Sequence, residues 1–434
     1  MKSLFLHGGT CLTMNAQGDL LENSVIEVRD GKIFSIKSDP DFILPQGAEG
    51  IDTRDCLVTP GFVNAHTHTG MTLFRGIADE LPLRQWLETK IFPLEAKWGK
   101  PDLVYFATLL ACAEMIKSGT TCFNDMYYCE EDAARAVHEA GLRANCGQAV
   151  TEIGGLDELN KNPLDKFDEY LKVISNYPLV RPALAPHSIY GVSDKMWQKL
   201  VEYSRSRNIL IHVHVAETQS EEDHYQKKLG ISPTEYFERI GLWENEVVAA
   251  HCTCVTEKGI EILGKYKVGI AYNPESNLKL GTKICPVVDL RKMGARLAFG
   301  TDGVASNNNL DILQEASTGA KLQSYRYGVG AFTAEEAFRL LTSEGAHAVG
   351  WGKVVGSLEV GKEADVVAVD VKKPHAAPLY QPYSHLIYSA SGADVKHVVV
   401  RGRLLLKDYR LQTLDEEQIL RDARLWGEKL AKSS

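Results

Sequence analysis

Long apolar runs are missing from this 434-residue sequence. No stretch of about 18 consecutive apolar residues occurs, so we expect no transmembrane helix and no membrane partner. The first residues, MKSLFLHGGTCLTMNAQGDL, contain only a short apolar patch, which is too short for the core of a secretory signal peptide. We therefore expect a cytoplasmic protein.

Dense positive charge and a disulfide framework are missing as well. The formal net charge is −9 and no compact run of lysine and arginine occurs, which argues against a nucleic-acid partner. The nine cysteines are odd in number and scattered, which is typical of reduced thiols in the cytoplasm. Cys252 and Cys254 form a C-x-C beside His251, but no second cysteine pair follows, so we favour buried thiols there over a zinc site.

Eight short apolar runs, each followed by a stretch with helical spacing, fill the middle of the chain. Near-continuous apolar strands that alternate with helices predict a parallel sheet covered on both faces. Eight such units predict a (β/α)₈ barrel, an α/β fold of about 250–300 residues. The runs are LVTPGFVNAHTH, TTCFNDM, LRANCGQAV, VRPALAPHS, ILIHVHVAE, VVAAHCTC, KVGIAYNPE and ARLAFGTDG.

The two ends of the chain show strand-like alternation and little helical spacing. Residues 1–58 include SVIEVRDGKIFSIKS, with Asp30-Gly31 as a hairpin turn. Residues 356–410 contain similar runs, such as VKHVVVRGRLLLKD. We predict that these flanks form one small β-sandwich, that residues 59–355 form the barrel, and that residues 411–434 form a C-terminal helix.

Polar residues stand at the ends of the apolar runs. In a barrel of this kind the active site lies where the strands end. A buried strand rarely needs a histidine, because an unpaired polar group is costly to bury. The residues concerned are His66, His68, His187, His214, Glu217, His251 and Asp302.

The spacing of His66 and His68 places both side chains on the same face of a strand, so they can reach one ion. With His214 and Asp302 they give three imidazoles and a carboxylate, which suits catalytic zinc, although other divalent ions accept such ligands. We expect His212, which lies deeper in the barrel, to be a hydrogen-bonded interior residue. The remaining histidines, such as His7, His138, His224, His347 and His397, are interpreted as structural or surface residues.

The motifs PGFVNAHTHTGMTLFRG, HVHVAET, AAHCTCV, NPESNLKLG and GTDGVASNN resemble those of the amidohydrolase superfamily. With LRQWLETKIFPLEAKWG, the pattern is similar to the deaminases of 5′-methylthioadenosine and S-adenosylhomocysteine. The resemblance covers nearly the whole chain.

The resemblance implies one divalent metal ion, zinc by preference, held by His66, His68, His214 and Asp302. Binuclear relatives have a carboxylated lysine where this chain reads Ala185-Pro186-His187, so one ion is favoured. His187 then contacts the substrate sugar, with a role as second ligand as the alternative.

The implied reaction is hydrolytic deamination at C6 of an adenine ring. The metal lowers the pKa of its water. In such enzymes the residue matching Asp302 accepts a proton from that water, the residue matching Glu217 protonates N1, and the residue matching His251 hydrogen-bonds the attacking oxygen.

The resemblance also implies substrate contacts. Glu95 accepts hydrogen bonds from the ribose hydroxyls, with Glu88 as the rival residue, and Trp86 packs on the sugar or thioether. Ser306, Asn273 and Asn277 are weaker candidates. Where some relatives carry an arginine for the homocysteine carboxylate, this chain has Gln148, and Arg143 lies earlier in the run, where it is buried or paired. Methylthioadenosine or adenosine is therefore favoured over S-adenosylhomocysteine.

Two other functions stay open. One is a related aminohydrolase or chlorohydrolase that acts on guanine, a pterin or an s-triazine. The other, more remote, is a barrel without catalysis that serves as a scaffold. The predicted partner is a small nucleoside, with a second copy of the chain as a further possibility, and the P-C-x-x-C motif of zinc deaminases that act on nucleic acids is absent.

Overall fold

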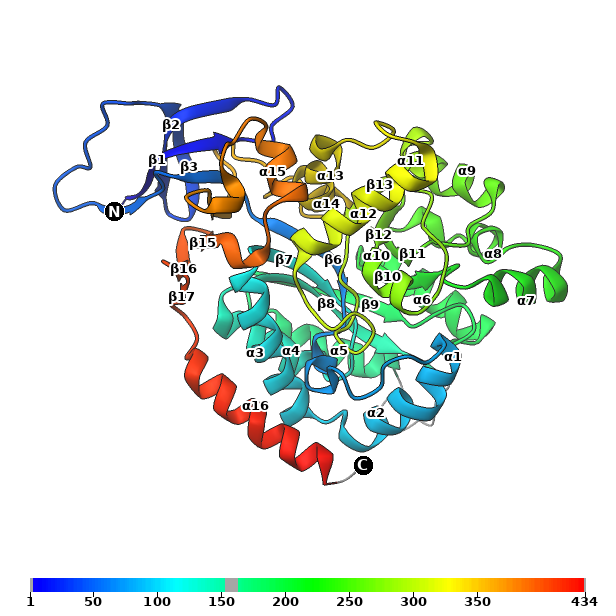
Figure 1. Cartoon of the computed structure of the whole chain (residues 1–434). Coiled ribbons are helices and arrows are strands. Elements are labelled where there is room, and N and C mark those ends of the chain that lie inside the picture. Colours follow the sequence, from blue (N-terminus) through cyan, green and yellow to red (C-terminus); the bar gives the residue numbers. More distant parts are fainter. Residues whose placement is uncertain (1–2, 153–162, 433–434) are drawn as a thin grey trace.

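The computed structural model describes residues 3–152 and 163–432. Its centre is an eight-stranded parallel sheet, curled into a nearly closed barrel with helices outside it (Figure 1). The strands follow one another in chain order, and the predicted barrel is confirmed. They are β6 (Phe62–Thr67), β7 (Thr120–Asp125), β8 (Arg143–Val150), β9 (Val180–Pro186), β10 (Leu210–Val215), β11 (Val247–His251), β12 (Gly269–Tyr272) and β13 (Arg296–Phe299).

The barrel strands are buried on both faces because helices cover the outside and side chains fill the inside. Every residue of β10 is buried, for example. Small residues such as Ala65 and Ala250 pack in the interior. Trp351 packs with them, and its Nε1 donates a hydrogen bond of 2.9 Å to Oδ1 of Asn145 near the start of β8. The strand ends on the opposite side are therefore left to form a site.

Several helices begin or end at capping residues that the sequence predicts. Ser193 accepts a hydrogen bond from the backbone of Met196, and Gly141 has the left-handed φ of 86° that favours glycine after a helix. The barrel helices are α3 (Pro101–Lys117), α4 (Glu130–Ala140), α5 (Pro163–Ile174), α6 (Asp194–Arg207), α7 (Gln219–Leu229), α8 (Pro233–Arg239), α9 (Glu257–Lys265), α10 (Pro274–Lys279), α11 (Val287–Lys292), α12 (Ile312–Tyr327), α13 (Ala334–Leu341) and α14 (Ser343–Ala348).

A second sheet combines strands from both ends of the chain. Its order is β17-β16-β15-β14-β5-β1-β2-β3, and β4 pairs with β1. The strands are β1 (Leu4–Leu12), β2 (Leu20–Arg29), β3 (Lys32–Ser38), β4 (Glu49–Asp52), β5 (Cys56–Pro60), β14 (Val366–Asp370), β15 (Val395–Val400), β16 (Arg403–Lys407) and β17 (Arg410–Leu411). The predicted pairing of the two flanks is thus confirmed by the antiparallel pair of β5 and β14.

The limits of the three predicted units stay a prediction, and residues 1–2, 153–162 and 433–434 of those units lie outside the described ranges. One residue, Gly61, separates β5 of the second sheet from β6 of the barrel. A Cβ atom on Gly61 would lie 2.0 Å from Oγ1 of Thr121, so only glycine fits at this junction.

The last segments pack on the outside of the barrel. α15 (Pro382–Tyr388) lies between β14 and β15 along the chain and packs on α12 and α13, and α16 (Glu416–Ala431) begins at the capping residue Asp415. Trp426 of α16 meets Phe106 of α3, with ring centroids 6.5 Å apart. In Figure 1, α16 is the red helix beside α3. Within the described residues, none of the helices has the length and apolar character needed to cross a membrane.

Candidate metal centre and active site

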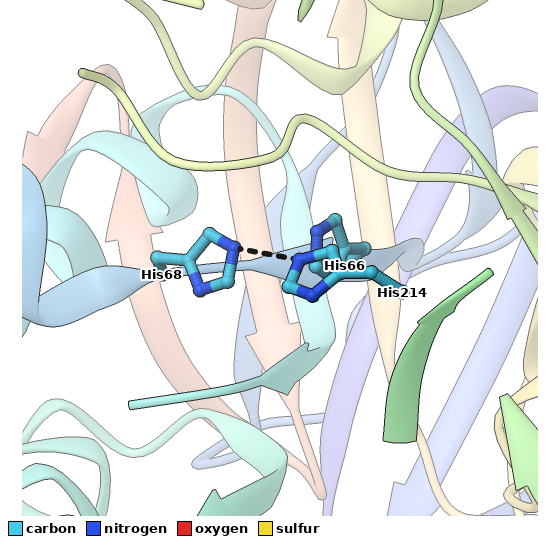
Figure 2. A group of neighbouring side chains, drawn as sticks. All are labelled: His66, His68 and His214. Atoms are coloured by element: carbon cyan, nitrogen blue, oxygen red, sulfur yellow. Dashed lines mark hydrogen bonds between the residues drawn. The ribbon is translucent and has the colours of Figure 1, made fainter. Parts of the chain in front are cut away.

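His66, His68 and His214 meet at the mouth of the barrel, where β6 and β10 end. One ring nitrogen of each lies within 4.8 Å of the others. Figure 2 shows the rings turned toward one another. Nε2 of His68 and Nε2 of His214 are 3.4 Å apart. All three side chains are buried, so they cannot be solvated instead.

The hydrogen positions on these rings can be derived from their neighbours. Nδ1 of His68 lies 2.7 Å from the carbonyl oxygen of Met126, and Nδ1 of His214 lies 2.6 Å from that of His187. Because a carbonyl oxygen only accepts, both Nδ1 atoms carry the hydrogen. The facing Nε2 atoms therefore present lone pairs to each other, an arrangement that a cation between them would stabilise.

A chain of hydrogen bonds orients His66 in the same way. Nδ1 of His212 lies 3.1 Å from the carbonyl oxygen of Asp125, so its Nε2 accepts from Nδ1 of His66 at 2.8 Å. Nε2 of His66 is left with a lone pair and, within the described residues, without a hydrogen-bond partner. His212 lies one layer deeper, fully buried and hydrogen-bonded, which is the interior role the sequence predicted.

Asp302 faces the histidines from the segment after β13. Its Oδ1 lies 3.3 Å from Nε2 of His66 and 3.2 Å from Nε2 of His68. Its Oδ2 accepts hydrogen bonds from the hydroxyls of Ser276 and Ser306. Burial works to raise the pKa of Asp302, but its contacts with the imidazoles of His66 and His68 in their protonated, metal-free form outweigh it and hold the pKa well below its ordinary value. The carboxylate is therefore anionic.

Three imidazole lone pairs and one carboxylate oxygen thus converge from four positions that the sequence had singled out. This donor set fits a divalent ion, and zinc in particular. The orphaned Nε2 of His66 is the observation that carries the fit, because a buried nitrogen without a partner is costly unless an ion fills the place.

His251 lies beside these residues, but its hydrogen sits on the other ring nitrogen. Its Nδ1 receives hydrogen bonds from the side-chain amides of Asn273 and Asn277, at 3.2 and 2.9 Å. An amide NH₂ only donates, so the hydrogen of His251 sits on Nε2. His66, His251 and Asp302 also lie close enough to form a metal group. The protonated Nε2 makes His251 a hydrogen-bond donor and leaves the metal to the other histidines.

Glu217 lies three residues after His214, next to His251. Its Oε1 is 3.8 Å from Nε2 of His251, and its side chain is buried. Burial, with the negative charges of Asp302 and Glu221, raises the pKa of Glu217 well above its ordinary value. The carboxyl group therefore holds a proton that it can donate.

A cavity opens beside these groups and brings together most of the predicted substrate contacts. Trp86, Glu95, His187 and Ser306 all line it, together with Glu217. Burial, with the nearby His68 and His66, lowers the pKa of His187 to about 4, so this ring is neutral. The hydroxyl of Ser306 donates a hydrogen bond to Asp302, so in this structure it contacts a proposed metal ligand.

Gln148 is not brought to the cavity lining. Its side-chain oxygen accepts a hydrogen bond of 3.3 Å from the backbone N–H of Glu130 at the start of α4. Arg143 points to the other end of the barrel, where it pairs with Glu363 and Asp365. No arginine or lysine lines the cavity among the described residues.

Glu95 projects from α2 (Phe92–Trp98) and is only 3% exposed. Burial raises its pKa to about 7, against the opposing effects of His68 and of the hydroxyl of Tyr127. The rival residue Glu88 lies on the surface, where it pairs with Arg84 at 2.8 Å. Of the two, only Glu95 faces the cavity.

The rest of the lining was not predicted from the sequence. It consists mostly of apolar and aromatic side chains whose types also suit an ordinary core, so only the fold reveals them. They are Met71, Leu83, Leu87, Phe92, Met126, Tyr127, Tyr128, Ala149 and Leu280.

The cysteines take no part in a metal group among the described residues. Cys252 and Cys254 are buried and unpaired. Burial raises the pKa of the Cys254 thiol, which keeps it protonated and inert. The expectation of ordinary buried thiols therefore agrees with the structure.

Known proteins resemble this chain over its whole length. The profile of the amidohydrolase family matches residues 57–405. A 5-methylthioadenosine/S-adenosylhomocysteine deaminase from Thermodesulfovibrio yellowstonii is 38% identical over 444 residues, which cover 100% of each chain. A 5′-deoxyadenosine deaminase from Methanosarcina acetivorans is 37% identical over 437 residues, which cover 99% of each.

Solved structures show the same similarity. An adenosine deaminase from Xanthomonas campestris with bound zinc superimposes with a TM-score of 0.93, at 33% identity and 99% coverage of both chains. A zinc complex of atrazine chlorohydrolase from Arthrobacter aurescens has a TM-score of 0.87 at 21% identity, covering 98% of this chain and 100% of the other. The latter is a likeness of fold alone.

Proposed function

The chain belongs to the amidohydrolase family, and on that premise we propose that it hydrolyses the C6 amino group of adenosine-type nucleosides. One water is consumed and one ammonia is released, so that the inosine analogue is formed. The observation that carries the proposal is the meeting of His66, His68, His214 and Asp302 beside a cavity that contains Glu217 and Glu95. The names of the relatives describe deaminases of such nucleosides. The adenosine deaminase structure with bound zinc supports zinc as the metal.

Each ionisable group has a separate task in the proposed reaction. The three histidines and Asp302 would hold a divalent ion, which would supply a water of lowered pKa. Asp302, anionic and hydrogen-bonded through Oδ2, accepts a proton from the attacking water. The N–H at Nε2 of His251 donates to the oxygen of that water and orients it toward C6.

Glu217 supplies the proton that the ring needs. When oxygen adds to C6, negative charge develops on N1. The carboxyl group of Glu217 is protonated because burial raises its pKa, so it can donate to N1 as the charge forms. Asp302 then passes the proton it accepted to the amino group at C6, ammonia leaves as the C6 carbonyl forms, and the proton of the C6 hydroxyl group returns to Glu217.

The cavity favours a nucleoside with an uncharged 5′ substituent. Glu95 offers two acceptor oxygens to the ribose diol, and Trp86 supplies an aromatic surface. Leu83, Leu87 and Phe92 give the lining an apolar character that suits a methylthio group. A homocysteine carboxylate would meet no cation among the described lining residues, and an unpaired buried charge is costly.

Steady-state assays on a substrate panel test this proposal. The panel contains 5′-methylthioadenosine, 5′-deoxyadenosine, adenosine, S-adenosylhomocysteine, guanine and a chloro-s-triazine. We expect the first three to show the highest kcat/KM, with S-adenosylhomocysteine about 10-fold or more below methylthioadenosine. Faster turnover of guanine or of the chlorotriazine would contradict the assignment of a ribosyl substrate.

We also propose that the enzyme works in the reducing cytoplasm. The support is that all nine cysteines are free and eight of them are buried.

A further inference from the structure

Ala216 and Glu217, which we call the link, follow β10 directly and precede Thr218, the capping residue of α7. Ala216 has a φ of 48°, in the left-handed region that an alanine rarely adopts. Such a conformation persists only where the surroundings fix it. Glu217, which carries the proposed proton donor, follows directly, so the conformation of this link determines where its side chain points.

Glu221 fixes the link from one side. Its Oε1 accepts a hydrogen bond of 3.0 Å from the backbone N–H of Ala216, and its Oε2 accepts one of 3.3 Å from the backbone N–H of Glu217. Glu221 is itself held in the first turn of α7, where its N–H donates to the hydroxyl of Thr218. Its side chain is buried, with 6% exposed, so water does not compete for these bonds.

The loop after β11 holds the carbonyl groups of the same two residues. The hydroxyl of Thr253 donates to the carbonyl oxygen of Glu217 at 2.6 Å. The backbone N–H of Cys254 donates to the carbonyl oxygen of Ala216 at 2.9 Å. All four backbone polar groups of the link are therefore paired, which is what a buried non-helical segment requires.

The carboxyl group of Glu217, in contrast, makes no hydrogen bond to any other described residue. Its Oε1 lies 3.8 Å from Nε2 of His251, which is beyond hydrogen-bond distance. Because no described side chain orients this carboxyl group by a hydrogen bond, its position in the cavity depends on the conformation of the backbone at Glu217. Displacement by as little as 1 Å can reduce a rate about 100-fold.

We propose that Glu221 is the positioning residue of Glu217. Its carboxylate accepts hydrogen bonds from both N–H groups of the link, and Thr253 holds the link from the opposite side by donating to the carbonyl oxygen of Glu217. The inference rests on the proposed function, because it takes Glu217 as the group that gives a proton to the ring. Glu221 belongs neither to the cavity lining nor to a metal group, and among the lining residues it hydrogen-bonds to Glu217, through the backbone N–H of that residue.

A double-mutant cycle tests the inference on the full-length, zinc-loaded protein. The variants are Glu221→Gln, Glu217→Gln and the double variant, with methylthioadenosine as substrate. An amide at position 221 keeps the volume but turns one acceptor into a donor against an N–H. We expect Glu221→Gln to lower kcat about 10- to 100-fold, with KM within about 2-fold and with unchanged zinc content.

The chain provides a matched control in Glu222, the next residue. It is also a buried glutamate of α7, with 4% exposed, but its carboxylate does not bond to the link. Glu222→Gln should leave kcat within about 2-fold of the wild type. An equal loss in both variants would mean that any change in this turn of α7 is harmful and would overturn the inference.

The cycle separates the inference from the proposed function. If Glu221 acts through Glu217, the double variant should be no slower than Glu217→Gln alone. Multiplied losses in the double variant would reject the positioning role. Near-normal turnover of Glu217→Gln alone would instead reject the proposed acid. Should Glu221→Gln fail to fold, Thr253→Val removes the hydrogen bond to the carbonyl oxygen of Glu217 on the opposite side of the link. This variant should show the same loss of kcat and the same lack of additivity.

Discussion

Glu88 and Glu95 show how much one residue's surroundings decide. The two side chains are identical and seven residues apart, a spacing that puts both on one face of a regular α-helix. Glu88 lies in a π-helical turn, η2 (Leu87–Ile91), which follows α1 (Leu83–Trp86) and precedes α2, the helix of Glu95. The wider winding of this turn shifts the face, so that Glu95 is buried at the cavity and Glu88 is exposed. The sequence pattern does not encode this shift, which is why the two stood as rivals.

This pair supplies a controlled test of the ribose contact. At about pH 8, where Glu95 is anionic because its pKa is about 7, Glu95→Ala should raise KM for methylthioadenosine and lower its kcat/KM by about 100-fold, since up to two charge-assisted hydrogen bonds are lost. Glu88→Ala, which only breaks a surface pair with Arg84, should change kcat/KM less than 2-fold. Free adenine, which lacks the diol, should be affected little by either change. An equal loss on adenine and on the nucleoside would remove the sugar contact.

Glu95 also makes stability depend on pH. Burial raises its folded-state pKa from 4.5 to about 7, so the folded chain keeps a proton that the unfolded chain has lost. The contribution of Glu95 to the free energy of unfolding is therefore full below about pH 4.5 and falls as the pH rises to about 7. Glu95→Gln has no such proton to lose. Relative to the wild type, its stability should increase by about 3 kcal/mol between these two pH values.

Urea unfolding of both proteins at about pH 5 and about pH 8, at equal zinc concentration, measures this difference. Glu88→Gln, at the exposed position, should follow the wild type at both pH values. A constant difference between Glu95→Gln and the wild type would show that Glu95 has an ordinary pKa.

At the same scale, the sequence predicted the metal-facing residues better than the residues that hold them. His66, His68, His214 and Asp302 stand at strand ends, where side-chain spacing and chemistry are visible in one dimension. Tyr127 and Glu221 are common residue types that acquire a role only through neighbours brought together by the fold. No periodicity marks a glutamate whose partners are two backbone N–H groups.

At the scale of elements, Arg143 ties the barrel to the second sheet. It begins β8, and its Nε donates to Oδ2 of Asp365 at 3.0 Å, just before β14. Its Nη2 also meets Glu363 at 2.7 Å, and the guanidinium lies 4.6 Å from the centre of the Trp351 ring. Burial opposes the charge of Arg143, but the Asp365 carboxylate outweighs it and keeps the pKa raised. The arginine therefore has a structural role, far from the cavity.

Removal of one partner should destabilise the whole fold. Asp365→Asn leaves the buried guanidinium without its main counter-ion, which costs about 3–5 kcal/mol of unfolding free energy. The control is Glu261→Gln in α9, which breaks an exposed pair with Lys258 and should cost less than about 1 kcal/mol. Urea unfolding followed by circular dichroism measures both. Equal free energies of unfolding for the two variants would mean that the buried pair does not stabilise the fold more than a surface pair does.

The elements themselves were largely predictable. Each of the eight apolar runs became a barrel strand, because burial on both faces leaves an uninterrupted apolar signal. The turn at Asp30-Gly31 followed from residues that tolerate the positive φ values of 50° and 78° found there. Short pieces such as β4 and β17 escaped prediction, because a strand of two to four residues exists only through the neighbour that it pairs with.

At the scale of the whole molecule, the metal site joins segments that are far apart in the chain. Its proposed ligands come from β6, from β10 and from the segment after β13, the strands that include both edges of the barrel sheet. The backbone N–H of Asp302 donates to the carbonyl oxygen of His66 at 2.9 Å, which bridges those two edges. An ion bound here therefore stabilises the closed barrel as well as the reaction.

Removal of the metal should consequently reduce both activity and stability. A ligand that binds only the folded state adds about 4 kcal/mol when its concentration is 1,000 times Kd, so a chelator should lower the melting temperature as well as abolish turnover. Restored zinc, at about one equivalent per chain, should recover both.

His214→Ala should behave like the chelated protein and respond no further to chelator, whereas His138→Ala, on the exposed face of α4, should match the wild type. A chelated protein that keeps its turnover at less than about 0.1 equivalents of metal would disprove the metal-dependent reaction. A chain that stays inactive after zinc is restored would favour the scaffold, because the convergent histidines would then stabilise the barrel without catalysis.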